Sequence, residues 1–273
     1  MYEAHFGLSR KPFATYPEPD MMYWAEGHKM ARTMLVYGLT ATNGIVVITG
    51  EIGSGKTTLL TDIINRNESG HVLGRLNGAI GLGTDVSAWV LYAFGIDTGS
   101  VSATTSMGQL QEFLRQIQAR GRKAVLFIDE AQLLPEHVIE ELRLLSDMQI
   151  GMMPVLQLVL LGQPELANKL NSPNLLQFRQ RIVSHYHLKA FAPNETLEYV
   201  VFRLHKAGGR SDLLSDEAVE SLHDLTDGIP RRINKLVDTA FVYAYAQGMD
   251  SVTKDVIEKV IQDRGDHGML QID

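Results

Sequence analysis

The sequence predicts an α/β fold, in which a parallel sheet core is followed by an α-helical lid. An apolar run at 45–49 leads into a glycine-rich turn, and apolar residues at helical spacing follow the turn. Strand and helix patterns then alternate as far as residue 188, which is typical of a parallel sheet covered on both faces. Beyond residue 195 every pattern is helical. The first two observations predict the core, and the third predicts the lid.

The first 43 residues form a polar, proline-marked segment that ends in a helical pattern from about Gly27 to Leu39. We expect this N-terminal segment (1–43) to pack on the core. Its aromatic residues could pack beside an adenine ring or simply hold the segment in place, and packing is the commoner role of an aromatic side chain. The prolines are Pro12, Pro17 and Pro19, and the aromatic residues are Phe6, Phe13 and Tyr16.

The turn behind the first strand reads Gly-x-x-x-x-Gly-Lys-Thr and ends at Thr57. Its glycines can adopt conformations closed to other residues, so that successive N–H groups point at a phosphate. The following helix adds unpaired N–H groups and the positive end of its dipole. Lys56 would contact the β- and γ-phosphates, and the Thr57 hydroxyl would bind Mg²⁺. We predict an ATP–Mg²⁺ site whose nucleotide-binding residues are Gly50, Gly53, Ser54, Gly55, Lys56, Thr57 and Thr58.

The acidic half of this site is predicted at Asp129 and Glu130, which follow the apolar strand 124–128. A carboxylate at this position can hold Mg²⁺ opposite Thr57, directly or through water. Asp129 is therefore the second metal ligand that we predict. Glu130 is placed to accept a proton from the water that attacks the γ-phosphate. A strand that ends in Asp-Glu is common by chance, so the pair alone is weak evidence for a metal site. Together with the phosphate-binding motif upstream it is strong evidence.

The other core elements continue the alternation. We expect strands at 71–76, 156–161 and 183–188, and helices at 86–94, at 107–120 and from Pro135 onward. Gln163 follows one of these strands, where an α/β sheet places groups that contact ligands. Its amide could orient the attacking water or contact the γ-phosphate. Equally, it could be a turn residue before Pro164.

Arginines supply the remaining candidates. Arg231 lies at the start of the third lid helix, and arginine suits bidentate phosphate recognition. Positive charge is disfavoured at a helix N-terminus, which favours a functional role over a solvated one. Either Arg179 or Arg181 could project into a neighbouring subunit's ATP site, and the alternative is surface charge or an ion pair with Glu165 or Glu195.

His185 and His187 alternate on one strand, at a spacing that a metal could use. No third ligand is apparent in the sequence, so packing or surface roles are favoured. In the lid we expect helices at 195–206, 216–226, 231–247 and 254–263, with Asn194 as the N-cap of the first. The resulting division is a nucleotide-binding core at 44–190, a lid at 191–264 and a flexible tail at 265–273.

The length, net charge and residue composition of the chain exclude or disfavour several classes of function. The chain has 273 residues, which is enough for about two domains. Its net charge of −7 disfavours a broad nucleic-acid surface, although a local basic face stays open. Without cysteine there are no disulfides, thiolate zinc sites or cysteine nucleophiles. The sequence contains neither a signal peptide nor an apolar run near the roughly 20 residues that span a bilayer. We expect a cytoplasmic protein, which would need a partner to recruit it to the inner membrane.

Several motifs occur together in an order that one family shares. They are the glycine-rich turn, the opening Met-Tyr-Glu-Ala-His-Phe-Gly-Leu with Pro12–Phe13, Phe-Ile-Asp-Glu-Ala-Gln at 127–132, Leu-Gly-Gln-Pro-Glu-Leu at 161–166, Gln-Arg at 180–181 and Gly-Ile-Pro-Arg-Arg-Ile-Asn at 228–234. The chain resembles the AAA+ ATPases of the general secretion protein A (ExeA) group from residue 1 to about 262. It looks closest to the stand-alone ATPases of exosortase-linked exopolysaccharide clusters and of the mannose-sensitive haemagglutinin pilus. Transposition ATPases of the TniB/TnsC kind share the same core.

The resemblance implies a P-loop NTPase core of the AAA+ type and a role for each matched residue. By this resemblance, Lys56 with Thr57 would be the Walker A pair, and Asp129 with Glu130 the Walker B pair. Gln163 matches the sensor-1 position.

Arg231 matches the sensor-2 position, which would couple the lid to the γ-phosphate. Arg181 is the best match for an arginine finger supplied in trans. Arg179 is the alternative, because the two arginines bracket Gln180.

We therefore predict an AAA+ ATPase that hydrolyses ATP–Mg²⁺ at the subunit interfaces of a homo-oligomer. With membrane-associated partner proteins, it would assemble or regulate an envelope secretion, exopolysaccharide or pilus export system. The alternative is a DNA-associated transposition regulator, which the net charge disfavours. A third hypothesis is a nucleotide-stabilised scaffold, against which Glu130 argues because a scaffold needs no positioned base. The basic residues that could serve DNA binding are Arg203, His205, Lys206 and Arg210.

Overall fold

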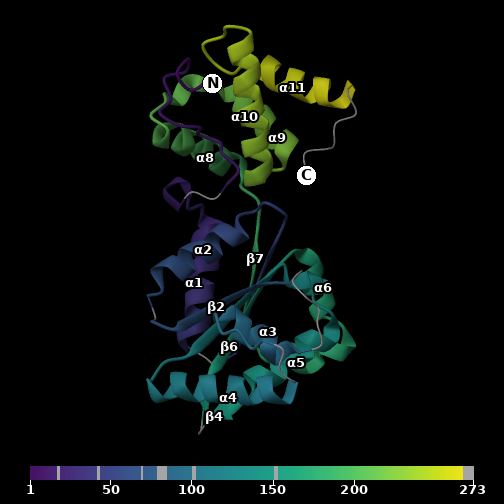
Figure 1. Ribbon diagram of the computed structural model, residues 1–273. Helices are drawn as coiled ribbons and strands as arrows, with labels where there is room; N and C mark the ends of the chain where they lie inside the picture. Colours follow the sequence, from purple (N-terminus) through teal and green to yellow (C-terminus); the bar gives the residue numbers. More distant parts are fainter. Residues whose placement is uncertain are drawn as a thin grey trace. The chain divides into compact units, whose positions relative to one another are not determined.

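Five apolar strands form one parallel sheet in the order β2-β3-β6-β1-β7 (Figure 1). Every residue of the three central strands β1, β3 and β6 is buried, as expected where helices cover both faces of a sheet. The edge strand β7 alternates between buried and more exposed residues. The strands are β1 (Ile45–Gly50), β2 (Val72–Asn77), β3 (Ala124–Asp129), β6 (Leu156–Gly162) and β7 (Ile182–Leu188).

The structure is a computed structural model that describes residues 1–16, 19–41, 44–68, 70–78, 85–99, 103–150 and 153–266. Pro17 and residues 267–273 of the expected tail lie outside the described residues. The chain divides into two units. The α/β unit comprises Met30–Gly50 and Leu59–Leu188, and the helical unit comprises Met1–Lys29, Glu51–Thr58 and Lys189–Asp273.

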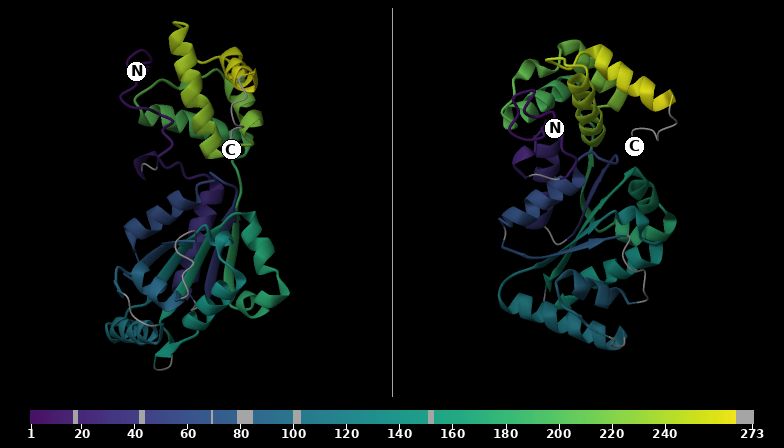
Figure 2. Two further views of the ribbon diagram at one scale, coloured as in Figure 1. Left: turned by 45° about the vertical axis from the view of Figure 1, so that its right-hand side comes forward. Right: turned by 45° about the horizontal axis from the view of Figure 1, so that its top comes forward.

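Two apolar clusters cover the two faces of the sheet, because neighbouring strand residues point to opposite sides. Val46 and Ile48 face a cluster that includes residues of α1 and α2, whereas Ile45 and Val47 face residues of α4, α5 and α6. The helices can be followed in Figure 2. They are α1 (Glu26–Ala41), α2 (Lys56–Arg66), α3 (Val86–Ala93), α4 (Ala103–Ala119), α5 (Glu136–Ser146), α6 (Pro164–Leu170) and α7 (Leu176–Arg179).

The sheet and the helices around it confirm the predicted fold class. The short helices α6 and α7 and a small antiparallel hairpin were not expected from the sequence. This hairpin pairs β4 (Gln149–Ile150) with β5 (Met153–Pro154). Short 3-10 helices are η1 (Pro19–Met21), η2 (Ala131–Leu133), η3 (Pro173–Leu175) and η4 (Ser211–Leu213).

The helical unit contains the N-terminal residues as well as the last four helices. Tyr2, Phe6 and Phe13 are buried in its apolar cluster, and the Tyr2 ring stacks on Phe241 with centroids 5.3 Å apart. Residues 1–29 thus belong to the helical unit, and the segment from Met30 onward belongs to the α/β unit. Tyr16 is exposed. The four helices are α8 (Pro193–Lys206), α9 (Asp216–Thr226), α10 (Pro230–Ala246) and α11 (Lys254–Asp266).

The start of α8 differs from the prediction of an Asn194 N-cap. Ala192 is the N-cap and Pro193 is the first helical residue. The Glu195 carboxylate accepts a hydrogen bond from the Ala192 backbone N–H at 3.0 Å. Proline suits the first turn because its missing N–H is not needed there, and this moves the helix start two residues upstream.

Candidate nucleotide-binding and catalytic site

The glycine-rich turn, which follows β1, has the backbone that its sequence predicts. Gly53 and Gly55 adopt positive φ angles of +82° and +103°. A Cβ added at Gly53 would lie 2.5 Å from the Cβ of Arg231, and one at Gly55 would lie 2.7 Å from His28 Nε2. Both positions therefore require glycine for space as well as for conformation. A hydrogen bond from the Ser54 N–H to the Glu51 carbonyl, at 3.1 Å, stabilises the first part of the turn.

His28, in the first turn of α1, supports this loop from the side. Its Nε2 lies 3.0 Å from the Ser54 carbonyl oxygen, so the ring donates its Nε2 proton there. Burial of the ring lowers the His28 pKa, against smaller raising effects of the Ser54 carbonyl and the Glu195 charge. His28 therefore acts as a neutral hydrogen-bond donor that fixes the loop, a role that the sequence did not reveal.

Two cationic residues of the helical unit, Lys56 and Arg231, lie at the same loop. Lys56 begins α2 and is 6% exposed, and its Nζ donates to the Glu51 carbonyl at 2.9 Å. Arg231, in the first turn of α10, donates its backbone N–H to the Gly53 carbonyl at 3.3 Å. Its neighbour Arg232 is ion-paired with Asp227 at 2.8 Å. The structure thus brings the predicted sensor-2 residue to the phosphate loop.

Asp129 ends β3 in the α/β unit, and its side chain is 6% exposed. Its Oδ2 lies 3.1 Å from Nη2 of Arg75 on β2, and its Oδ1 accepts the Glu130 backbone N–H at 3.1 Å. A buried carboxylate needs such partners. Arg75 was not identified from the sequence, because only the parallel pairing of β2 with β3 brings the two residues together.

Glu130 has a left-handed backbone, with φ of +53° and ψ of +39°. Its Oε2 accepts hydrogen bonds from Gln132 Nε2 at 2.6 Å and from Gln163 Nε2 at 3.2 Å. The Gln132 side-chain oxygen in turn accepts the Gln163 backbone N–H at 3.0 Å. The structure therefore brings together the predicted base and the predicted sensor-1 residue. It adds Gln132, the last residue of the motif at 127–132, to which the sequence analysis assigned no role.

The two candidate trans arginines lie on the surface of the α/β unit. Arg181 Nη2 is 3.2 Å from Asp147 Oδ2, and its side chain is 58% exposed. Arg179 Nη1 lies 3.4 Å from the backbone and side-chain oxygens of Asn171. The ion pair of Arg181 is thus with Asp147, and the suggested partners Glu165 and Glu195 are not involved.

The two histidines of β7 share one hydroxyl. Thr49 Oγ1 lies 3.2 Å from His185 Nε2 and 3.1 Å from His187 Nδ1. Burial and then the neighbouring His187 lower the His185 pKa. Within the described ranges, no three His, Cys, Asp or Glu side chains gather as a metal site. The pair therefore forms hydrogen bonds to Thr49, one residue before the end of β1.

The residues of the glycine-rich turn fit a nucleoside triphosphate. Two glycines with positive φ leave the backbone N–H groups of the loop open to a phosphate. Lys56 places a buried cation beside the loop. The buried Ser54 Oγ has no hydrogen-bond partner in the described chain. Mg²⁺ on phosphates needs only one or two protein oxygens, and the Thr57 hydroxyl is of the kind it binds. Within the part of the chain that the structure describes, no helix combines the length and apolar character of a bilayer-spanning segment.

Comparisons with known proteins agree with this chemistry. Residues 39–170 match the AAA domain family. The chain is 36% identical over 257 residues to the General secretion pathway protein A of Aeromonas hydrophila. This match covers 92% of the chain and 46% of that protein, so the chain spans about half the length of the curated relative.

Solved structures show the same fold at low identity. The ORC2 protein of Aeropyrum pernix in ADPNP–ADP complexes has a TM-score of 0.67 and 18% identity, over 93% of this chain and 72% of that one. Cdc6p from Pyrobaculum aerophilum has a TM-score of 0.67 and 16% identity, over 88% of this chain and 67% of that one. Residues 39–170 thus match the AAA domain family, and the chain has the fold of P-loop ATPases of this kind.

Proposed function

We propose that this ATPase assembles or regulates an envelope export system that serves secretion, exopolysaccharide export or pilus formation. The observation that carries the proposal is the 36% identity, over 92% of the chain, to the General secretion pathway protein A of Aeromonas hydrophila. The protein would work on the cytoplasmic side of the inner membrane, where membrane-associated partners recruit it.

In this proposal the loop residues Gly50–Thr58 bind the phosphates, and Thr57 with Asp129 holds Mg²⁺. When bound, the metal ion neutralises charge on the phosphates. Glu130 accepts the proton of the attacking water. Its carboxylate is already oriented, because Gln132 and Gln163 both donate to Oε2.

Arg231 would contact the γ-phosphate and so make the helical unit sensitive to its presence. Two features support this role. The Arg231 backbone is hydrogen-bonded to the phosphate loop at Gly53, and in the described chain its guanidinium forms no ion pair, in contrast to Arg232. A charged group near an anion site without a carboxylate partner is suited to a phosphate ligand.

Hydrolysis would take place in a homo-oligomer, where Arg181 of one subunit completes the site of the next. Its present partner is Asp147, and because the Arg181 side chain is 58% exposed, an ion pair so open to water contributes roughly 0–1 kcal/mol. Arg181 can therefore exchange Asp147 for a triphosphate at little cost. Arg179 is the alternative.

Two of the basic residues considered for DNA binding in the alternative function are already engaged within the chain. Arg203 is 6% exposed, and its guanidinium donates to the backbone carbonyls of Pro12, Ala14 and Met21. Its charge is satisfied by backbone carbonyl groups inside the helical unit and is therefore not available to bind DNA phosphates. Arg210, another member of that set, is ion-paired with Asp212 at 3.0 Å.

The site assignment is tested with Glu130→Gln. We expect ATP affinity to stay within about threefold, because the phosphate loop is untouched, while phosphate release falls by about a hundredfold or more. Nucleotide titration and phosphate release measure the two quantities separately. Glu141→Gln, at an exposed glutamate on α5, is the matched control and should leave both unchanged. Unaltered turnover in Glu130→Gln would exclude Glu130 as the base.

The cellular role is tested by expressing the Glu130→Gln variant in cells that also carry the natural gene. Inactive subunits would enter the oligomer and stop polysaccharide export or pilus assembly. A transposition assay in the same cells should be unaffected. Loss of transposition with intact export would favour the DNA-associated function instead.

A further inference from the structure

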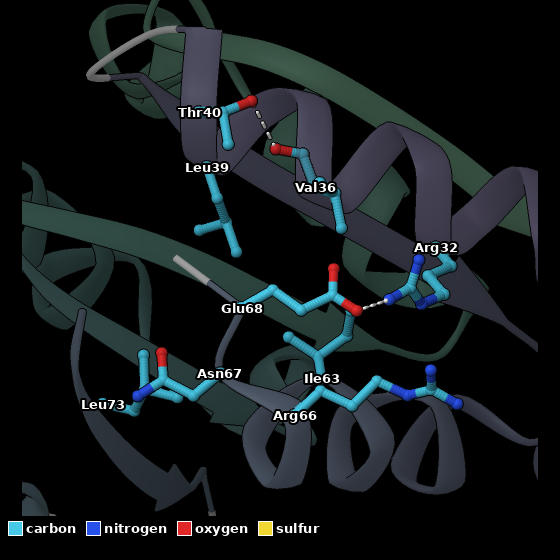
Figure 3. A pocket seen from close by; sticks show the side chains of 9 residues that line it. All are labelled: Arg32, Val36, Leu39, Thr40, Ile63, Arg66, Asn67, Glu68 and Leu73. Atoms are coloured by element: carbon cyan, nitrogen blue, oxygen red, sulfur yellow. Dashed lines mark hydrogen bonds and ion pairs between the residues drawn. The ribbon is translucent and has the colours of Figure 1, made fainter. Parts of the chain in front are cut away.

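A pocket of about 180 Å³ opens in the α/β unit between α1, α2 and β2 (Figure 3). Its walls are mainly apolar and include Val36 and Leu39 of α1, Ile63 of α2 and Leu73 of β2. An apolar cavity of about 150 Å³ is large enough to hold benzene. The pocket can therefore hold one phenyl or branched alkyl group. None of the residues proposed for ATP hydrolysis lines it.

Charged groups of both signs lie at the mouth of the pocket. Arg32 Nη2 donates to Glu68 Oε1 at 2.7 Å, as Figure 3 shows. Asp62 lies beside the pocket and binds Arg66 Nε at 2.8 Å and Arg32 Nε at 3.5 Å. Two guanidinium groups thus face two carboxylates, and the four charges sum to zero. A ligand that carries one positive and one negative charge matches this mouth better than a simple anion or cation.

Each guanidinium keeps donors for a ligand. A guanidinium carries five N–H groups in a fixed fork, and in the described chain the contacts of Arg66 use only Nε. The side chains of Arg66 and Glu68 are 52% and 58% exposed, so they can turn toward an incoming group without leaving water. A carboxylate would bind the free edges of the two arginines.

The side-chain oxygen of Asn67 is a hydrogen-bond acceptor that no donor of the described chain satisfies. Its Nδ2 donates to the His71 carbonyl at 3.0 Å, which fixes the orientation of the amide. Its Oδ1 is shielded from water and accepts no hydrogen bond in the described chain. An acceptor in this state destabilises the folded protein, because it has lost its water without gaining a donor. An ammonium group of a ligand would supply the missing donor, with the Glu68 carboxylate as its counter-charge.

We propose that this pocket binds a free apolar α-amino acid in its zwitterionic form. The apolar side chain fills the space between Val36, Leu39, Ile63 and Leu73. The carboxylate binds Arg32 and Arg66, and the ammonium group binds Glu68 and Asn67 Oδ1. A residue within a peptide does not carry both charges on one carbon, which restricts the ligand to the free amino acid.

The first test uses the unchanged protein without nucleotide, so that its outcome is independent of ATP hydrolysis. Saturation-transfer NMR and calorimetry would follow L-phenylalanine and L-leucine. Phenylacetate lacks the ammonium group and 2-phenylethylamine lacks the carboxylate. We expect each to bind about two- to fivefold more weakly than L-phenylalanine, the loss of one exposed charge pair. Equal binding of phenylacetate, or no binding of either amino acid, would overturn the proposal.

The second test locates the site with variants. Arg32→Gln and Glu68→Gln should each weaken L-phenylalanine binding about two- to fivefold. Val36→Phe fills the pocket and should abolish binding. Arg115→Gln removes an arginine paired with Glu112 on α4 and is the matched control. If Glu68→Gln tightened binding, the pocket would instead be an anion site that Glu68 blocks, and the zwitterion proposal would be wrong.

Discussion

The Gln132 side-chain amide donates a hydrogen bond to the Glu130 carboxylate, with 2.6 Å between Nε2 and Oε2. The two residues can meet because Glu130 has a left-handed backbone, which turns the chain sharply at the end of β3. A non-glycine residue in this conformation is uncommon and is retained where the surroundings hold it. The contact therefore orients a side chain that the reaction would need at a defined angle.

Replacing Gln132 by alanine should lower turnover without removing nucleotide binding. The Glu130 carboxylate would lose its shorter hydrogen bond, and the Gln163 backbone N–H would lose its acceptor. We expect kcat to fall by about tenfold or more, because a misplaced catalytic group loses part of its orientation advantage. Nucleotide titration and phosphate release measure the two effects. Gln116→Ala, which removes a similar contact to Glu112 on the exposed side of α4, should change neither.

Local patterns made much of the α/β unit predictable. The run 45–49 and the turn behind it determine their own conformation, because β-branched residues favour buried strands and glycines allow positive φ. The acidic residues 129–130 were predictable for the same reason, since they directly follow an apolar strand.

Contacts between distant segments were not predictable. The Asp129–Arg75 pair depends on which strands are neighbours in the sheet, and the His28–Ser54 contact joins residues 26 positions apart. Arg203 was considered as a DNA-binding residue because its sequence neighbours are basic. Its actual partners are backbone carbonyls of residues 12–21, about 190 residues away in the sequence.

Lys56→Ala should remove most of the affinity for ATP. The lysine is buried beside the phosphate loop, so its ammonium group would meet the phosphates in a site that largely excludes water. Truncating one partner of such a charge pair costs roughly 2–5 kcal/mol, or at least about thirtyfold in Kd. Equilibrium titration with a fluorescent ATP analogue would measure the change. Lys259→Ala, at an exposed lysine of α11, serves as control, and an unchanged Kd for Lys56→Ala would contradict the assignment.

Arg203→Leu should destabilise the helical unit by about 3 kcal/mol or more, because several buried carbonyl groups lose a charged donor at once. Urea unfolding can follow this unit through Trp24 in a Trp89→Phe background, since Trp89 belongs to the α/β unit. Arg210→Ala removes only an exposed ion pair and should cost less than about 1 kcal/mol. Equal stability losses for the two variants would show that Arg203 does not hold residues 12–21 in place.

His28 should make stability sensitive to acid. Burial lowers its pKa in the folded protein, whereas the unfolded chain has the ordinary value of about 6.5. Between these two values the unfolded state binds more protons, so stability is fully present above about pH 6.5 and falls as pH decreases toward the folded pKa. His28→Gln keeps an N–H donor for the Ser54 carbonyl but does not titrate.

Urea unfolding of both proteins at pH 7.5 and pH 5.5 measures this effect. The natural protein should lose more stability between the two conditions than His28→Gln. The pKa values of His71 and His185 are also lowered by burial, but these residues are present in both proteins, so their contributions cancel in the comparison. An equal loss in the two proteins would mean that His28 carries a proton in the folded state.

Mixed oligomers can show whether Arg181 acts in the neighbouring subunit. Arg181→Ala subunits keep an intact phosphate loop, and Lys56→Ala subunits keep Arg181, so each alone should be nearly inactive. In an equal mixture, roughly a quarter of the interfaces in a closed ring pair an intact loop with an intact arginine. ATPase activity should therefore recover to about that fraction. Arg179→Ala mixed with Lys56→Ala discriminates between the two arginines, because recovery confined to that mixture would assign the trans role to Arg179. Asp147→Asn removes the partner of Arg181 within its own chain, together with the Arg143 ion pair at 2.8 Å, and the activity per folded protein should stay intact or rise.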